Sequence, residues 1–311
     1  MTDKPQRKLR IGLALGSGAA RGWAHIGVIR ELQRNNIVPD IVCGTSIGAL
    51  VGVAMASGEL SALEDWVRSL KWQKVISYFD FTMNGGLIKG EKLFEFFREN
   101  VRDRAIEDLD MPFGAIATDL ANGREIWLRE GSMFEAVRAS ISLPGLFTPV
   151  ERDDVLLVDG GLVNPIPVSM CRALGADVVI AVDLNSDLLS AARRDRDGML
   201  STANSASSET SPLSEPVSLL DRIQNKLASA LALESTDHDT PSMTDVVTAS
   251  INIMQVRITR SRLAGEPADS LVTPHLAHFA LLDFHRANEA IETGAAATAQ
   301  VIPQINSLLH R

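Results

Sequence analysis

The feature that most constrains the fold of this chain is a pair of strand, turn and helix units near its start. Residues 9–15 predict a buried strand, followed by glycine-rich residues 16–18 and by apolar residues at helical spacing to Asn36. A second short strand is predicted at 39–43 and leads directly into a predicted helix over 46–57. Repeated units of this kind predict an α/β fold with a mixed, mostly parallel sheet covered by helices.

Further segments extend this pattern to about residue 185. Additional strands are predicted at 113–118, 125–128, 155–158 and 178–182, and additional helices at 60–70, 91–101, 133–140 and 167–174. We therefore expect an N-terminal tail over 1–8 and one α/β core over 9–186.

The chain changes character after this core. Between residues 201 and 214, eight of fourteen residues are Ser or Thr, so we predict a mobile Ser-rich insertion over 187–216. Apolar residues return at helical spacing over 219–231 and 247–258, which predicts two amphipathic helices. We expect 217–311 to be a C-terminal helical region packing on the core, with a lid or a lipid- or partner-facing surface as the alternative.

Composition excludes several classes of protein. The chain has 45% hydrophobic and 22% charged residues, as a folded globular protein does. The net charge of −9 gives no positive field to recruit nucleic acid, or to hold the protein on anionic lipid by charge alone. Cys43 and Cys171 have no metal-ligand or redox spacing, so we predict a reducing, cytoplasmic location, with peripheral membrane contact at most.

Two stretches resemble targeting or membrane segments. Residues 11–20 are apolar and follow several basic residues, as in a secretory signal. Residues 41–58 contain no charge, which reaches the lower length limit of a spanning helix. Because glycines favour a turn in the first stretch and divide the second into a strand and a helix, we expect neither a signal nor a spanning segment.

The strongest chemical motif is Gly44-Thr45-Ser46-Ile47-Gly48, between a predicted strand and a predicted helix. Small residues two positions before and after a serine permit the sharp turn of a nucleophile elbow. Ser46 would then sit at a helix N-terminus, where free N–H groups and the helix dipole favour negative charge. The alternative is a helix-capping serine beside packing glycines.

The first strand is followed by a second motif, the loop Gly16-Ser17-Gly18-Ala19-Ala20-Arg21-Gly22. Its backbone N–H groups can converge on an anion. As a dinucleotide fingerprint the loop is incomplete, because Arg21 replaces the third glycine, although Asp40 follows at a suitable distance. The other use of such a loop is an oxyanion hole for Ser46.

A serine nucleophile needs a base. The histidines carry no local signature, and each is predicted to be structural or exposed: His25, His238, His275, His278, His285 and His310. The other candidate is Asp159, which ends an apolar strand before Gly160 and Gly161. Its alternative role is that of an ordinary turn-forming Asp-Gly.

Together these residues resemble the patatin-like phospholipase family, in particular its bacterial branch similar to the catalytic domain of neuropathy target esterase. The resemblance covers residues 11–184 and is weaker around 282–292. It rests on the loop 16–22 and the elbow 44–48, and on segments 24–28, 117–120, Ala139-Ser140 to Leu143-Pro144, 147–150, Asp159 to Leu162 and Asn164-Pro165.

Such a resemblance implies a serine acyl hydrolase with a Ser-Asp dyad and no catalytic histidine. We expect neither a cofactor nor a metal. Carried over residue by residue, Ser46 is the nucleophile and Asp159 the base, and the oxyanion hole is formed by the 16–22 loop with Ile47. Arg21 matches the family's basic residue, with a surface arginine as the alternative. Ser17 and Ala19 stand where close relatives have glycine, which leaves open the choice of N–H groups facing the substrate.

The expected substrates are lysophospholipids, phospholipids or simpler acyl esters, met during transient peripheral contact with a membrane, and no nucleic acid is expected. One alternative is a regulatory or scaffold protein on the same fold, in which the insertion and the cluster of Arg257, Arg260 and Arg262 engage a partner. The other is nucleotide binding at the glycine-rich loop.

Overall fold

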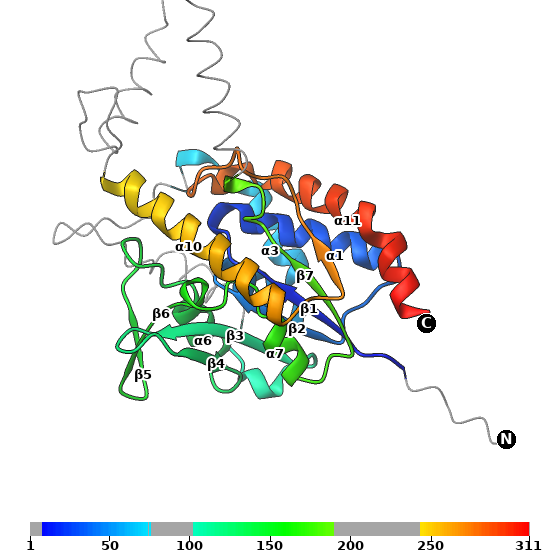
Figure 1. The fold of residues 1–311 in the computed structure, drawn as a ribbon, viewed down its shortest axis with the longest axis horizontal. Helices are drawn as coiled ribbons and strands as arrows, with labels where there is room; N and C mark the ends of the chain where they lie inside the picture. Colours follow the sequence, from blue (N-terminus) through cyan, green and yellow to red (C-terminus); the bar gives the residue numbers. More distant parts are fainter. Residues whose placement is uncertain (1–7, 74, 76–101, 190–242, 311) are drawn as a thin grey trace, which may run out of the picture. The chain divides into compact units, whose positions relative to one another are not determined.

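The computed structural model describes residues 8–73, 75, 102–189 and 243–310 of the 311-residue chain (Figure 1). The chain divides into two compact units, residues 1–188 with 255–311, and residues 189–254. The predicted segments 91–101 and 219–231, and all but the start of 187–216, lie outside the described residues. The domain boundaries drawn from the sequence therefore stay a prediction.

The first unit is built on an eight-stranded mixed sheet. Its strands are β1 (Ile11–Leu15), β2 (Ile41–Thr45), β3 (Phe113–Asp119), β4 (Glu125–Leu128), β5 (Val150–Arg152), β6 (Val155–Asp159), β7 (Val178–Val182) and β8 (Ser270–Val272). The order is β5-β6-β3-β2-β1-β7-β8, and β4 pairs with β3 off this path. The run from β3 to β8 is parallel, whereas the β3-β4, β3-β6 and β5-β6 pairs are antiparallel. The predicted fold class is confirmed; β5 and β8 were not predicted, because three residues are too short to show a strand period.

One edge of β3 carries two strands end to end. β2 runs parallel to it and reaches Thr45 opposite Ile116, while β6 runs antiparallel to it and reaches Asp159 opposite Ala117. β4 pairs with the other edge over the same stretch of β3. The ends of β2 and β6 are therefore brought together by neighbouring residues of a single strand.

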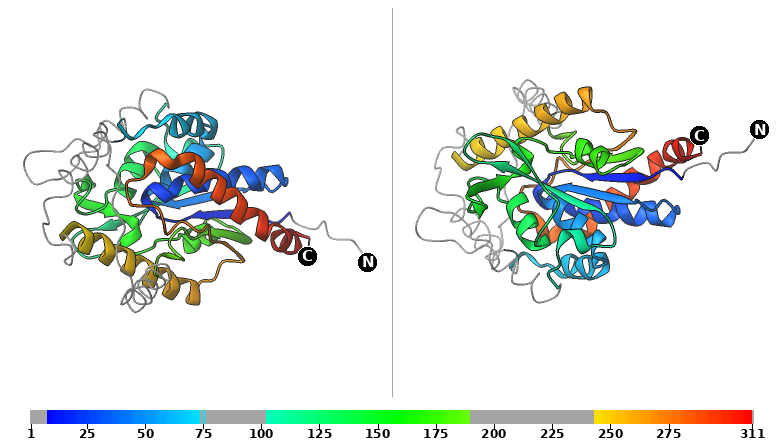
Figure 2. Two further views of the ribbon diagram at one scale, coloured as in Figure 1. Left: turned by 90° about the horizontal axis from the view of Figure 1, so that it is seen from above. Right: turned by 90° about the horizontal axis from the view of Figure 1, so that it is seen from below.

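Helices cover both faces of the sheet. They are α1 (Ala24–Arg34), α2 (Ile47–Ala56), α3 (Leu60–Ser69), α6 (Met133–Ser140), α7 (Val168–Ala173), α10 (Met243–Gly265) and α11 (Ala287–Leu309), with 3-10 turns η1 (Ala19–Trp23), η2 (Ile106–Asp108), η3 (Gly160–Leu162) and η4 (Phe284–Arg286). Successive strand residues face opposite sides, so Leu13 and Leu15 join the larger core with α1, α2, α3, α6 and α11, while Ala14 joins a second core with α7. Figure 2 shows α1 and α11 together on one side of the sheet.

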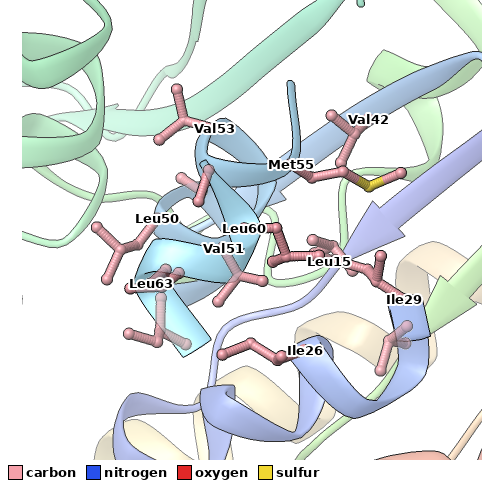
Figure 3. Packing of buried hydrophobic residues seen from close by; sticks show 14 of the residues in the cluster. Leu15, Ile26, Ile29, Val42, Leu50, Val51, Val53, Met55, Leu60 and Leu63 are labelled. Carbon is pink, nitrogen blue, oxygen red and sulfur yellow. The ribbon is translucent and has the colours of Figure 1, made fainter. Parts of the chain in front are cut away.

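Helix α2 is buried along its whole length. Leu50, Val51, Val53 and Met55 of this helix meet Leu15 of β1 and side chains of α1 and α3 (Figure 3). A helix that is apolar on every side belongs in a protein interior or a bilayer, and here it is interior. The uncharged stretch 41–58 is thus a strand followed by a core helix, as expected. Within the part of the chain that the structure describes, no helix is long and apolar enough to cross a membrane.

Candidate active site

Ser46 joins β2 to α2 in a strained conformation. Its φ of 57° and ψ of −125° are rare for a residue with a side chain and cost about 1–3 kcal/mol. The turn depends on its glycines: a Cβ on Gly44 would lie 2.3 Å from the carbonyl oxygen of Gly48, and one on Gly48 would lie 2.2 Å from that of Leu15. The Ser46 side chain makes no capping hydrogen bond to α2, so the interpretation as a helix-capping serine is wrong.

The Ser46 hydroxyl instead bonds to Asp159. Its Oγ donates to Asp159 Oδ2 at 2.5 Å, and the other carboxylate oxygen, Oδ1, accepts from the N–H of Gly161 at 2.7 Å. The Asp159 backbone is held as well, because its carbonyl accepts from Thr118 Oγ1 at 2.8 Å and its N–H donates to the carbonyl of Ser142 at 3.0 Å. One oxygen of Asp159 therefore organises the turn, and the other accepts the hydrogen bond of the Ser46 hydroxyl.

Burial tunes the acidity of this carboxyl. Asp159 is fully buried, and burial raises its pKa to about 6, although the hydrogen bonds from Ser46 and Gly161 act in the opposite direction. An unperturbed aspartate is a poor base at neutral pH, whereas a carboxylate with a pKa near 6 is closer to the optimum for accepting a proton.

A second serine holds the elbow. The N–H of Ser46 donates to Ser140 Oγ at 2.9 Å, and Ser140 is buried at the end of α6. No role for Ser140 was predicted from the sequence. Its signal was present in the Ala139-Ser140 segment of the family resemblance.

The glycine-rich loop leaves two amides without an acceptor. The N–H groups of Gly16, Ser17, Ala20 and Arg21 donate to the carbonyls of Val182, Pro165, Leu281 and Gly18, respectively. Those of Gly18 and Ala19 have no hydrogen-bond acceptor among the described residues, nor has that of Ile47 at the start of α2. Ala19 takes a left-handed φ of 48°, a conformation more often given to glycine.

Two buried basic side chains support this loop. Arg21 Nε donates to the carbonyl of Gly18 at 3.1 Å, so the alternative of a surface arginine is wrong. Burial lowers the pKa of Arg21 to about 10, opposed by the charges of Asp187 and Asp183, and the group stays charged at neutral pH. His25 lies 2.8 Å from the carbonyl of Gly16 through Nε2, and burial lowers its pKa to about 4, so the neutral ring donates this bond from Nε2.

The other histidines lie elsewhere. His275 pairs with Asp187, His278 with Glu289 at 2.8 Å, His285 packs edge-on against Trp72, and His310 is exposed at the end of α11. His238 lies outside the described residues. The hydroxyl of Ser46 has Asp159, and no described histidine, as its hydrogen-bond acceptor.

Asp40 does not take part in the site. Its Oδ2 accepts from the N–H of Ile11 at 2.9 Å, at the start of β1, whereas the glycine-rich loop follows the end of that strand. A dinucleotide bound at the loop would therefore lack its acidic ribose partner.

An apolar cavity opens beside Ser46. Its described lining is entirely apolar apart from Ser46: Ala19, Trp23, Ile47, Leu50, Trp66, Leu70, Val75, Ile141, Leu143, Leu146, Phe147 and Phe284. Trp23 packs edge-on against Trp66 and Phe284, with ring centroids 6.2 Å and 5.7 Å apart, and its indole N–H donates to the carbonyl of Phe284. Trp23 is thus held in the cavity wall by two aromatic neighbours and one hydrogen bond.

Comparison with known proteins identifies the class to which this fold and site belong. Residues 13–172 match the family of patatin-like phospholipases, and the chain belongs to that family, whose members are lipid acyl hydrolases. The resemblance drawn from the motifs is confirmed.

Individual relatives place the chain near the NTE proteins. It is 34% identical to an uncharacterized NTE family protein of Mycobacterium tuberculosis, over 94% of this chain and 91% of that protein. Human patatin-like phospholipase domain-containing protein 6 is 35% identical over 57% of this chain but only 13% of its own length, and mouse protein 7 is 36% identical over 57% and 14%. VipD of Legionella pneumophila aligns in structure with a TM-score of 0.39 at 13% identity, over 96% of this chain and 77% of that one.

Proposed function

We propose that this protein is a serine hydrolase of lipid acyl esters, working through a dyad of Ser46 and Asp159. The observation that carries the proposal is the 2.5 Å hydrogen bond between these side chains, on a strained elbow beside an apolar cavity. Family membership supports the reaction class, and the geometry supports the roles of the two residues.

The proposed reaction has two steps. As Ser46 Oγ attacks the ester carbonyl, its proton passes to Asp159 Oδ2, and the same proton then goes to the departing alcohol as the acyl-enzyme forms. Water next attacks the acyl carbon and gives a proton to Asp159, and that proton returns to Ser46 as the fatty acid leaves. No histidine is needed in either step.

The oxyanion of each tetrahedral intermediate would be held by backbone N–H groups. The candidates are Gly18, Ala19 and Ile47, since all three lack another acceptor among the described residues, and Ala19 and Ile47 line the cavity beside Ser46. By analogy with measured oxyanion holes, each donor is worth about 3–4 kcal/mol of transition-state stabilisation.

The cavity suits the acyl chain of the substrate. Among the described residues, its wall offers hydrocarbon contact and no polar side chain apart from Ser46. An acyl chain would lie there with the ester carbonyl at Ser46 and the polar head group outside. This arrangement fits lysophospholipids, phospholipids and simpler acyl esters alike. Reaching phospholipids in a bilayer would require transient contact with a membrane surface. The two free, buried cysteines fit the proposed cytoplasmic setting.

A scaffold role without chemistry is the weaker proposal. A positive φ at Ser46 and an ionisable carboxyl buried at Asp159 both cost stability, and a pure scaffold has no need of either. Nucleotide binding is weaker still, because Asp40 is engaged at the far end of β1.

The test is labelling with a fluorophosphonate, followed by mass mapping of the modified residue. We expect the label on Ser46, together with hydrolysis of p-nitrophenyl esters that Ser46→Ala abolishes and Ser57→Ala, at the other end of α2, leaves intact. Hydrolysis by Ser46→Ala within a few-fold of the parent would contradict the proposal.

A further inference from the structure

One polar side chain from α10 lies between the two halves of the proposed site. Gln255 is buried, although it belongs to a helix whose neighbouring residues Met254 and Arg257 are exposed. Its Oε1 accepts from Ser17 Oγ at 3.1 Å and from Asn185 Nδ2 at 3.1 Å. Asn185 Nδ2 also lies 3.3 Å from the carbonyl oxygen of Ser17, which closes a small network on the glycine-rich loop.

The other end of the same carboxamide lies beside the proposed base. A Cβ placed on Gly161 would be 2.6 Å from Gln255 Nε2 and 2.9 Å from Asp159 Oδ1, so both atoms border one small space above Gly161. Because Oε1 already receives two donors, the amide must present its NH₂ group to this space. The positive end of the carboxamide and Oδ1 of Asp159 therefore border the same space, which any larger residue at position 161 would have to fill.

The network with Gln255 also explains why a polar side chain is buried at Ser17. The Ser17 side chain is buried and its hydroxyl reaches Gln255, so this serine forms a contact between the loop and α10.

We propose that Gln255 is a positioning residue, which ties the oxyanion loop at Ser17 to the turn that carries Asp159 and so makes α10 part of the active site. This inference rests on the proposed function. Gln255 touches no reacting atom; it acts by fixing the spacing between the oxyanion donors and the base. A displacement of about 1 Å at such a site can cost about 100-fold in rate.

The first experiment compares kinetics of Gln255→Leu with Thr259→Val, a control one turn further along α10 that replaces another buried polar residue. Thr259 Oγ1 has no hydrogen-bond partner in the described part of the chain, so its loss should leave kcat unchanged. Gln255→Leu should lower kcat by about 10- to 100-fold with KM nearly unchanged. A Gln255→Leu enzyme with the parent kcat would overturn the proposal.

The second experiment places a charge in the same space. Gln255→Glu keeps an oxygen that can accept from Ser17 and Asn185 but brings a carboxylate to Asp159, so the acidic limb of the pH–rate profile should move up by about one pH unit. Gln255→Leu and Thr259→Val should not show this shift. An unmoved limb in Gln255→Glu would mean that the carboxamide does not face the base.

The third experiment is independent of activity. If Ser17 and Gln255 are bonded, the Tm of the double variant Ser17→Ala with Gln255→Leu should lie above the value expected from adding the two single shifts. Strict additivity would contradict the tether. If the parent protein does not hydrolyse esters, or if Ser46→Ala still does, the proposed function is refuted. The double-mutant cycle of Tm values would still decide whether Gln255 holds the loop.

Discussion

Ser46 Oγ and Asp159 Oδ2 lie 2.5 Å apart, although 113 positions separate the two residues in the chain. The contact exists because β2 and β6 end at neighbouring positions on one edge of β3, with Thr45 opposite Ile116 and Asp159 opposite Ala117. The two strands approach this point from opposite directions. A parallel β6 would have carried its last residue away from the elbow.

Removing the proposed base should abolish turnover without unfolding the protein. Asp159→Asn keeps the size of the side chain, but an amide cannot take a proton at neutral pH, so kcat should fall by about 1,000- to 10,000-fold. His278→Gln, a histidine paired with Glu289 on the surface, should retain the parent rate. Steady-state kinetics on short p-nitrophenyl esters measure both. A collapse of rate in His25→Gln equal to that of Ser46→Ala would argue for a histidine base instead.

The acidic limb of the pH–rate profile should report Asp159. The base works as a carboxylate, and its pKa is about 6, so kcat/KM should fall as the pH drops through about 6. The measurement is kcat/KM on a neutral ester between pH 4.5 and 8.5 in constant ionic strength. A flat profile across pH 6, or a limb near pH 4, would contradict the assignment.

The Asp159 carboxyl should make the parent less stable at neutral pH than at about pH 4. Its folded pKa, about 6, lies above the ordinary value of 3.8, so the folded state binds the proton more tightly and loses stability as the pH rises from about 4 to 6. Relative to Asp159→Asn, the free energy of unfolding of the parent should decrease by up to about 3 kcal/mol across this range. Urea unfolding at pH 4.5 and 7.5 tests this difference, and an opposite sign would show that the carboxylate is stabilised in the folded protein.

Removing the Ser140 hydroxyl should weaken the turn that holds Ser46. Ser140→Ala removes the acceptor of the Ser46 N–H and leaves that donor buried, at a cost of about 1–3 kcal/mol in the free energy of unfolding. We expect kcat to fall by about 10- to 100-fold with KM little changed, since the strained serine loses one of its anchors. Ser142→Ala is the matched control, because the Ser142 hydroxyl bonds to Arg138 rather than to the elbow. Equal kinetics in the two variants would refute the role.

Narrowing the cavity should discriminate between acyl chains. Leu146 lines the cavity and is only partly buried, so Leu146→Trp should fold while occupying space beside Ser46. The expected result is a loss of kcat/KM for decanoyl and longer esters of about tenfold, with acetyl and butyryl esters nearly unaffected. Leu156→Trp changes an exposed leucine of β6 outside the cavity lining and should alter neither. A uniform loss across all chain lengths would mean that the acyl chain lies elsewhere.

Much of the fold was predictable from local patterns. Strands β4 and β7 and helix α6 begin and end at the predicted residues, because hydrophobic periodicity, glycine turns and the Ser132 helix cap are all encoded locally. The elbow was predictable for the same reason. The small residue at position 44 is required by contacts with Gly48 and Ala49 close by in the chain, whereas the one at position 48 is required by the backbone of Leu15 and Gly16 at the end of β1.

The partners of the site were decided by tertiary structure. The sequence by itself determined that Ser46 stands on a strand–helix turn and that Asp159 ends an apolar strand. It left open whether the two meet, because that depends on the register of β2 and β6 along β3. The raised pKa of Asp159, the Ser140 anchor and the Gln255 contact arise from burial and from segments up to 238 positions apart. Burial and hydrogen bonds of this kind depend on residues that are distant in the sequence and close only in the folded protein. No local sequence pattern predicts them.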